Sequence, residues 1–240
     1  MRESLFEFIN QSAPDTDIFC FQEIYVPFDE TGIWVGQSVA EKLSVFKAIQ
    51  ELLPDHIGVV EDPTAPKMGT RKGLATFVKK NIALDSYGEF MICNPAKIIS
   101  PKKVLTYGNL QYLEITEADD KYLIANIHGL FSEPKGDKLD NPDRLQQSRR
   151  IKEFLDNNSK LKVVVGDFNL WPETESIKII ETGMRNLIKE NNITSTRSSY
   201  FKFSNKYSNY VFVSPEINVL DFKVIETEVS DHLPLLLEFE

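Results

Sequence analysis

The chain has 240 residues, of which 42% are hydrophobic and 26% are charged, and this is the composition of an ordinary globular protein with a sizeable core. Its net charge of −9 argues against a protein that binds nucleic acid through a broad basic surface. The charge does not exclude a metal-dependent enzyme that acts on phosphate esters, because bound divalent cations reverse the local field.

The chain carries no clear targeting or redox signal. No apolar run approaches the roughly 20 residues that cross a bilayer, and the N-terminal residues show no secretory signal. Cys20 and Cys93 form neither a metal-binding nor a redox-type pair, so disulfide scaffolding is not expected. We expect a cytoplasmic monomer, and an upstream targeting segment stays open if the start is truncated.

Hydrophobic periodicity predicts the elements in chain order. Residues 4–9 have helical spacing, and Pro14 closes that helix. The alternating residues 17–25 predict a strand that ends near Glu23, and residues 37–53 predict an amphipathic helix. Short strands are expected next, over residues 56–60, 73–80, 103–107, 110–116 and 121–128.

The second half of the chain begins with a helix predicted over residues 140–158. Asp140 or Asn141 can cap this helix, and Pro142 suits its first turn. A buried strand follows, and then a mixed helical region and three further strands. These elements are expected over residues 162–169, 174–190, 209–214, 219–227 and 233–239.

The chain shows no internal repeat, low-complexity tract or linker, so we expect one domain over residues 1–240. Many strands with helices inserted at intervals predict a layered α/β sandwich rather than a regular βαβ alternation. In such folds the strand ends meet at the rim of a sheet, where an open sheet usually holds its ligand.

Several predicted strands end in polar residues that a hydrophobic core does not need. Taken alone, each has a structural explanation: a carboxylate that faces water, a buried histidine with satisfied hydrogen bonds, or a turn former. Two of the three histidines nevertheless occur at such ends, so the joint pattern is more informative than any single residue. The residues at these strand ends are Glu23, His128, Asp167, Asn169, Asp231 and His232.

Four short motifs at these strand ends carry a family resemblance: FQE at 21–23, NIHG at 126–129, GDFN at 166–169 and SDHLPL at 230–235. In this order and spacing they resemble the endonuclease/exonuclease/phosphatase superfamily over almost the whole chain. This is the metal-dependent phosphoesterase fold of deoxyribonuclease I and the neutral sphingomyelinases. The resemblance implies a four-layer αββα sandwich of two mixed β-sheets flanked by helices, with metal and phosphate held at one end.

The resemblance also implies a metal-dependent reaction on a phosphate ester. Glu23 is the expected chief ligand of Mg²⁺ or Mn²⁺, for which a hard carboxylate oxygen is suited. Asp231 is expected to add to the metal site and is also counted among the catalytic residues. Nucleic acids, nucleotides, inositol phosphates and phospholipid headgroups are all open as substrates, and the sequence does not choose among them.

The remaining strand-end residues are expected to act on water and phosphate. His232 is expected to accept a proton from the attacking water, since an imidazole titrates near neutrality. Asp167 is expected to orient that water. Asn169 is expected to hold a phosphate oxygen, and His128 to stabilise the same oxyanion.

Two departures from the superfamily pattern bear on activity. The family opens with a strand that carries an Asn near the metal, whereas this chain begins in the helix that follows, so the first strand is expected to be missing. The family also places an Asp where Asn209 stands in the sequence SNYVFVS. An asparagine can orient an imidazole but cannot stabilise imidazolium by charge, which leaves both full and reduced activity open. Asn126 and Asn209 are expected to support the site residues, and Asn209 is equally well explained as a polar residue at a strand start.

Basic residues cluster at 67–73, 97–103 and 144–152, and such runs more often form a solvated face than a binding site. The run GTRKG precedes a predicted strand, which makes Arg71 and Lys72 candidate phosphate contacts. We therefore predict a Mg²⁺- or Mn²⁺-dependent phosphoesterase. The alternative is a catalytically weakened or inactive phosphate- or ligand-binding module on the same fold, and a nucleic-acid-binding protein without chemistry is a third, weaker hypothesis.

Overall fold

The computed structural model describes residues 2–26, 45–60, 71–93, 108–131, 137–204 and 206–240. The predicted strand over residues 103–107 and the first part of the predicted helix over residues 37–53 lie outside this range. The rest of that helix is α3 (Val45–Leu52), and the other predicted helices and strands are present with shifted ends. Two strands that the sequence pattern did not predict are also present: β4 (Ala83–Met91), and the short β8 (Arg185–Asn186), which interrupts the helical region expected over residues 174–190.

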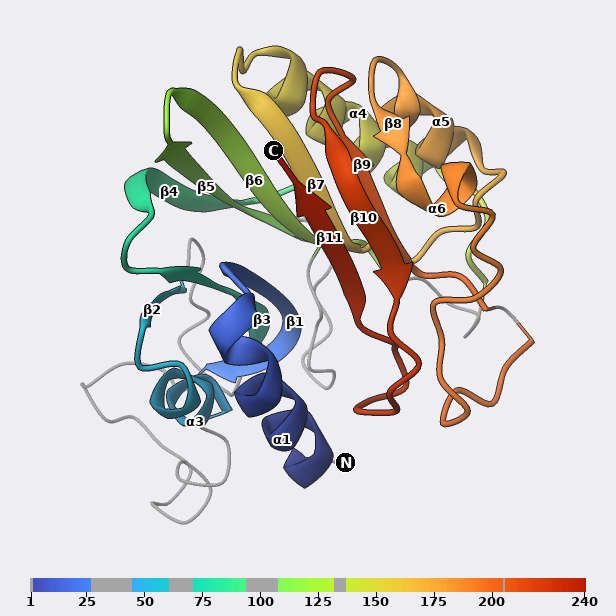
Figure 1. Cartoon of the computed structure of the whole chain (residues 1–240). Coiled ribbons are helices and arrows are strands. Elements are labelled where there is room, and N and C mark those ends of the chain that lie inside the picture. Colours follow the sequence, from blue (N-terminus) through green and yellow to red (C-terminus); the bar gives the residue numbers. More distant parts are fainter. Residues whose placement is uncertain (1, 27–44, 61–70, 94–107, 132–136, 205) are drawn as a thin grey trace.

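A six-stranded sheet forms the centre of the fold (Figure 1). β6 and β7 run parallel and are joined by helix α4 (Pro142–Asp156), while the other neighbouring strands are antiparallel, so this sheet is mixed. Val163 and Val164 on opposite faces of β7 are both buried, because both faces of the sheet are covered. In spatial order the strands are β4, β5 (Asn109–Glu117), β6 (Asp120–His128), β7 (Leu161–Asp167), β9 (Asn209–Val213) and β8 (Arg185–Asn186).

A second layer of strands covers one face of the six-stranded sheet (Figure 1). It consists of the antiparallel sheet β1 (Ile18–Val26), β3 (Arg71–Lys79) and β2 (His56–Val59), and of the hairpin β10 (Val219–Val224) and β11 (Leu235–Phe239). β1 contacts β6 and β7, and the rings of Tyr122 in β6 and Phe239 in β11 have centroids 5.5 Å apart, so both parts lie on the same face.

The chain enters this layer through a helix. The first element is the helix α1 (Arg2–Ser12), followed by a 3₁₀ turn at Ala13–Asp15. α1 is the first element of the described residues. Within those residues β1 pairs only with β3, and β11 pairs only with β10.

Helices form the two outer layers of the fold (Figure 1). α4 and α5 (Glu175–Glu181) lie on the other face of the six-stranded sheet, and the short α6 (Leu187–Glu190) packs against β9. α1 and α3 cover the three-stranded sheet, where a smaller hydrophobic cluster includes Ile9, Ile49 and Phe77. This order of helices, strands, strands and helices confirms the layered α/β sandwich. None of the described helices is long and apolar enough to span a membrane.

The cap of α4 resolves the choice between Asp140 and Asn141. Oδ1 of Asn141 accepts a hydrogen bond from the backbone N of Arg144 at 2.9 Å, so Asn141 is the cap. Asp140 instead accepts hydrogen bonds from the backbone N of Glu175 at 2.7 Å and of Ser176 at 3.0 Å. Its carboxylate therefore lies at the positive end of α5 and ties the starts of the two helices together.

Candidate active site

Three neighbouring strands of the six-stranded sheet bring polar residues to one level. His128 ends β6, Asp167 ends β7 and Asn209 begins β9, and the strand register pairs His128 with Asp167 and Asp167 with Asn209. Residues paired across neighbouring strands project to the same face. That face is the one covered by β1, because Asn126, two residues before His128, bonds to Gln22 of β1. The polar row therefore lies at the rim between the two strand layers.

The GDFN segment reaches this rim through a position that requires glycine. Gly166 has a φ of +139°, and a Cβ at this residue would lie 2.0 Å from the carbonyl oxygen of Ile127. Asn169 also has a positive φ of 55°, which Asn tolerates better than most residues. Its backbone N donates to Oδ1 of Asp167 at 2.9 Å, and its Nδ2 donates to the carbonyl of Gly129 at 3.2 Å. These bonds fix the turn that presents Asp167 and Asn169.

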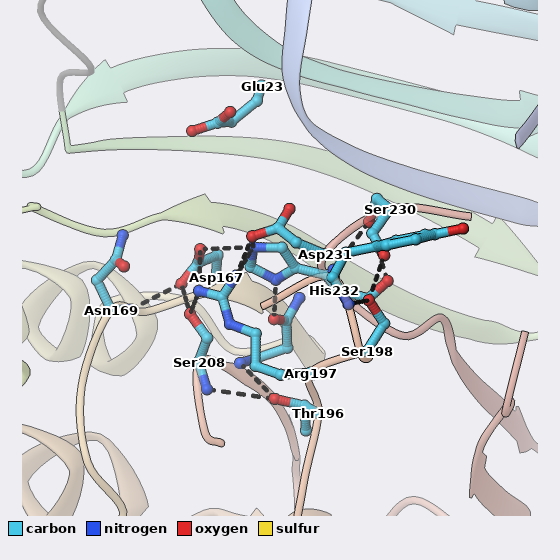
Figure 2. Close-up of polar contacts among 12 residues, drawn as sticks. Glu23, Asp167, Asn169, Thr196, Arg197, Ser198, Ser208, Ser230, Asp231 and His232 are labelled. Atoms are coloured by element: carbon cyan, nitrogen blue, oxygen red, sulfur yellow. Dashed lines mark hydrogen bonds and ion pairs between the residues drawn. The ribbon is translucent and has the colours of Figure 1, made fainter. Parts of the chain in front are cut away.

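Glu23 approaches the same site from β1, across the cluster from Ser208 (Figure 2). It lies in an irregularity of the β1–β3 pairing between Phe21 and Ile24 and has a φ of +57°, which is unusual for a residue other than glycine. Asn126 holds this irregularity in place, since Oδ1 accepts from Nε2 of Gln22 at 2.8 Å and Nδ2 donates to the carbonyl of Phe21 at 3.1 Å. Oε1 of Glu23 then lies 3.8 Å from Nε2 of His128.

His232 and Asp231 enter the site from the loop before β11. Nδ1 of His232 lies 2.5 Å from Oδ1 of Asn209, and Nε2 lies 3.5 Å from Oδ2 of Asp167. The backbone N of His232 donates to Oγ of Ser230 at 2.9 Å, which fixes the loop that carries it. The ring is therefore held on one side by Asn209. Figure 2 shows Asp167 beside the same ring.

Two buried cations, Arg197 and Lys138, complete the site. Nη1 of Arg197 donates to Oδ2 of Asp231 at 2.8 Å, and Nη2 lies 3.8 Å from Oδ2 of Asp167. Nζ of Lys138 donates to the carbonyl of Tyr207 at 2.7 Å. Sequence reasoning missed both residues, because neither lies on a periodic segment or in a recognised motif.

The buried charges at the site shift one another's pKa. Burial lowers the pKa of His232 to about 4, an effect that Asp167 opposes and Arg197 reinforces. Burial would raise the pKa of Asp167, but its neighbours, His232 and Lys138 foremost, outweigh burial and hold that pKa at about 2. Burial also lowers the pKa of Lys138, to about 8. At neutral pH the site therefore contains an ionised Asp167 beside an uncharged His232.

The structure brings most of the predicted site residues together. Not all predicted positions can be placed: Arg71 and Lys72 begin β3, but their side chains lie outside what the structure describes. The basic run on α4 is in part structural, since the fully buried Arg144 donates to the carbonyls of Leu139 and Asp137. The predicted residues that lie at the site are Glu23, His128, Asp167, Asn169, Asn209, Asp231 and His232, with Asn126 behind them.

The carboxylates at the rim suit a hard divalent cation. No three His, Cys, Asp or Glu side chains converge as a metal cluster among the described residues. Mg²⁺, however, usually keeps several waters and is bound by one or two carboxylates together with substrate phosphate. The side chains of Glu23 and Asp231 are 48% and 50% exposed, so both present oxygens to solvent at the rim. The residues therefore fit a cation of this kind.

Comparisons place the fold among known structures. No family model and no curated protein matches the sequence. The structure is similar to the mannosyl-6-phosphatase Bt3783 of Bacteroides thetaiotaomicron, with 18% identity, a TM-score of 0.68 and coverage of 99% of this chain and 91% of that one. It is also similar to the human Nocturnin catalytic domain with bound sulfate, with 18% identity, a TM-score of 0.65 and coverage of 100% and 87%. A third similar structure is D. rerio TDP2 complexed with a single-strand DNA product, with 11% identity, a TM-score of 0.67 and coverage of 100% and 92%.

Proposed function

Because the chain has the fold of the endonuclease/exonuclease/phosphatase proteins, we propose that it is a Mg²⁺- or Mn²⁺-dependent hydrolase of phosphate esters. The observation that carries the proposal is the position of His232 beside Asp167: Nε2 of His232 lies 3.5 Å from Oδ2 of Asp167. Asp167 in turn pairs with His128 on the neighbouring strand. Hydrolysis of a phosphate ester needs a base for the attacking water, a group that orients this water, and neutralisation of the phosphate oxygens. This rim offers residues for each requirement.

His232 is the proposed general base. Its Nδ1 is directed at Oδ1 of Asn209, an acceptor, so Nδ1 carries the hydrogen and Nε2 carries the lone pair. A pKa lowered to about 4 keeps Nε2 unprotonated at neutral pH. Asp167, ionised on the same side of the ring, is placed to orient the water from which Nε2 takes a proton.

Asn169 and His128 are the proposed donors to the phosphate oxygens. Both flank Asp167, His128 through the strand register and Asn169 through the turn that follows β7. An amide donates hydrogen bonds without adding negative charge, which suits it to an oxyanion. A divalent cation, when bound, neutralises developing charge on the same oxygens, and Glu23 and Asp231 are the residues that would hold it.

A panel of phosphate esters tests the proposal. It should contain synthetic mono- and diesters, nucleic acids, nucleotides, sugar and inositol phosphates and phospholipids, each assayed with Mg²⁺ and with Mn²⁺. We expect hydrolysis of at least one ester, its loss in a chelator and its return with excess cation. If the full natural protein hydrolyses no ester of the panel, the proposal that it is a phosphoesterase is rejected.

A non-catalytic binding module on the same fold is the second candidate. Asn209 favours it, because the residue that contacts Nδ1 of His232 is uncharged. A binding module would retain affinity for cation or phosphate without turnover, and the substitution His232→Ala would leave that affinity unchanged. An enzyme would lose turnover with the same substitution.

A further inference from the structure

Arg197 lies at the centre of the proposed site. Its side chain is only 5% exposed, and its backbone pairs with that of His232 in an isolated β-bridge. The guanidinium also lies over the ring of Phe201, with Cζ 4.2 Å from the ring centroid. A cation is thus built into the fold against the residue to which we assign proton transfer.

Figure 2 shows the residues around the Arg197 guanidinium, and two of them, Ser208 and Asp231, differ in their exposure to solvent. On the inner side, Nη2 donates to Oγ of the fully buried Ser208 at 2.9 Å. On the outer side, Nη1 donates to Asp231, whose side chain is 50% exposed. Nε is buried and has no hydrogen-bond partner among the described residues. A buried donor without a partner is costly, so the protein does not satisfy this guanidinium in full.

The contact between Arg197 and His232 determines the state of the proposed base. Nη1 of Arg197 contacts Nε2 of His232. A guanidinium can only donate, so Nε2 must be the acceptor in this contact. The lone pair that would take a proton from water is therefore occupied by Arg197, and His232 becomes a base only when Arg197 is drawn away.

We propose that Arg197 is a phosphate-binding residue, and that it exchanges His232 and Asp231 for oxygens of the substrate phosphate, which frees Nε2. The exchange is favourable because a planar guanidinium binds two phosphate oxygens at once, whereas Asp231 offers it one oxygen of a carboxylate that is half exposed and screened by solvent. Ser208 and Phe201 keep the guanidinium at the site during the exchange. The inference rests on the proposed function, and it makes activation of water depend on bound phosphate.

Binding of inorganic phosphate to the metal-free protein is the first test. Calorimetry would compare the natural protein with R197M, and with R185M as a control that removes an arginine paired with Glu190 away from the site. We expect R197M to bind phosphate at least about tenfold more weakly, because bidentate charge-assisted bonds are lost. R185M should bind as the natural protein does. Equal affinity in R197M and the natural protein would overturn the inference.

The ¹⁵N resonance of Nε2 in His232 is the second test, and it needs no variant. Saturating the natural protein with phosphate should move this resonance, as the bond from Arg197 is released. An unchanged resonance at saturation would overturn the inference, even if R197M does not fold.

Assays of ester hydrolysis separate this inference from the proposed function. Phosphate binding that depends on Arg197, in a protein that hydrolyses no ester, would reject the function and uphold the inference. Hydrolysis with unchanged KM and phosphate affinity in R197M would reject the inference alone.

Discussion

The ring of His232 is held by an amide, since Nδ1 lies 2.5 Å from Oδ1 of Asn209. The amide sets the tautomer and the direction of the ring as a carboxylate would. It does not supply the negative charge that stabilises the imidazolium formed when water loses its proton. In the proposed mechanism, general-base catalysis by His232 therefore lacks one electrostatic contribution.

Asn209→Asp is predicted to increase activity. The added carboxylate would stabilise imidazolium and raise the pKa of His232 above its present value of about 4. We expect kcat to rise by about tenfold or more, and the acid limb of the pH–rate profile to move to higher pH. Measurement of kcat against pH for both proteins checks this prediction, with Asn209→Ala as the variant that should lose activity. An unchanged kcat and profile would show that His232 does not gather charge in the rate-limiting step.

Glu23→Gln is predicted to weaken binding of the cation. The substitution keeps the size of the side chain and removes the charge that suits Mg²⁺ and Mn²⁺. Calorimetric titration with Mn²⁺ should show that E23Q binds the cation about tenfold or more weakly than the natural protein. Glu51→Gln, on the exposed side of α3, is the matched control and should bind as the natural protein does. Equal affinity for Mn²⁺ in E23Q and E51Q would show that Glu23 does not bind the cation.

Lys138 is predicted to reduce stability at neutral pH and to cost less as the pH rises. Burial lowers its pKa from 10.5 to about 8, so between these values the unfolded chain retains a proton that the folded protein has released. Stability contributed by this residue therefore rises with pH across that window, by up to about 3 kcal/mol.

The measurement for Lys138 compares the natural protein with K138M. Between about pH 7 and about pH 10.5, the free energy of unfolding of the natural protein should increase relative to that of K138M. K138M also leaves the Tyr207 carbonyl without its donor, but this cost does not vary with pH and so does not affect the slope. Lys47→Met, which removes an exposed lysine, controls for the loss of a charge. If the difference in free energy of unfolding between the two proteins does not change with pH, burial does not lower the pKa of Lys138.

Gly166→Ala is predicted to destabilise the fold. A Cβ would lie 2.0 Å from the carbonyl oxygen of Ile127, so β6 and β7 must separate at the site. We expect a loss of about 3 kcal/mol or more in the free energy of unfolding. Gly183→Ala is the matched control: its φ is also positive, at +75°, but a Cβ there meets nothing within 4 Å, so the loss should be only about 1 kcal/mol. Equal losses would attribute the effect to backbone conformation alone.

Strands with continuous apolar runs could be predicted from sequence, and β6 and β7 were. β4 was missed because its pattern is inverted: Tyr87 is exposed while Glu89 is buried, with Oε1 accepting from Nδ2 of Asn109 at 2.7 Å. Only the hydrogen bond from Asn109 on β5 explains why a carboxylate lies inside. A period-two reading of a single strand does not contain that information.

Some residues of the candidate site could likewise be predicted from sequence, and others could not. Asp167 and His232 could be predicted because each stands in a motif at the end of an apolar strand. Arg197 could not, because it lies in a stretch without periodicity, 35 residues before His232, and only the tertiary fold brings the two together. Lys138 was hidden for the same reason, since a lysine in a polar segment gives no sign that it will be buried.

In the proposed function, His232 and Asp167 together activate water for hydrolysis of a phosphate ester. The decisive measurement is kcat/KM on the best ester of the panel, with saturating Mn²⁺, for the natural protein, H232A and D167N. We expect each substitution to lower kcat/KM by about a hundredfold or more, and the double substitution to lower it little further, because the two residues act on one water. Activity of H232A within about twofold of the natural protein would show that His232 is not the general base.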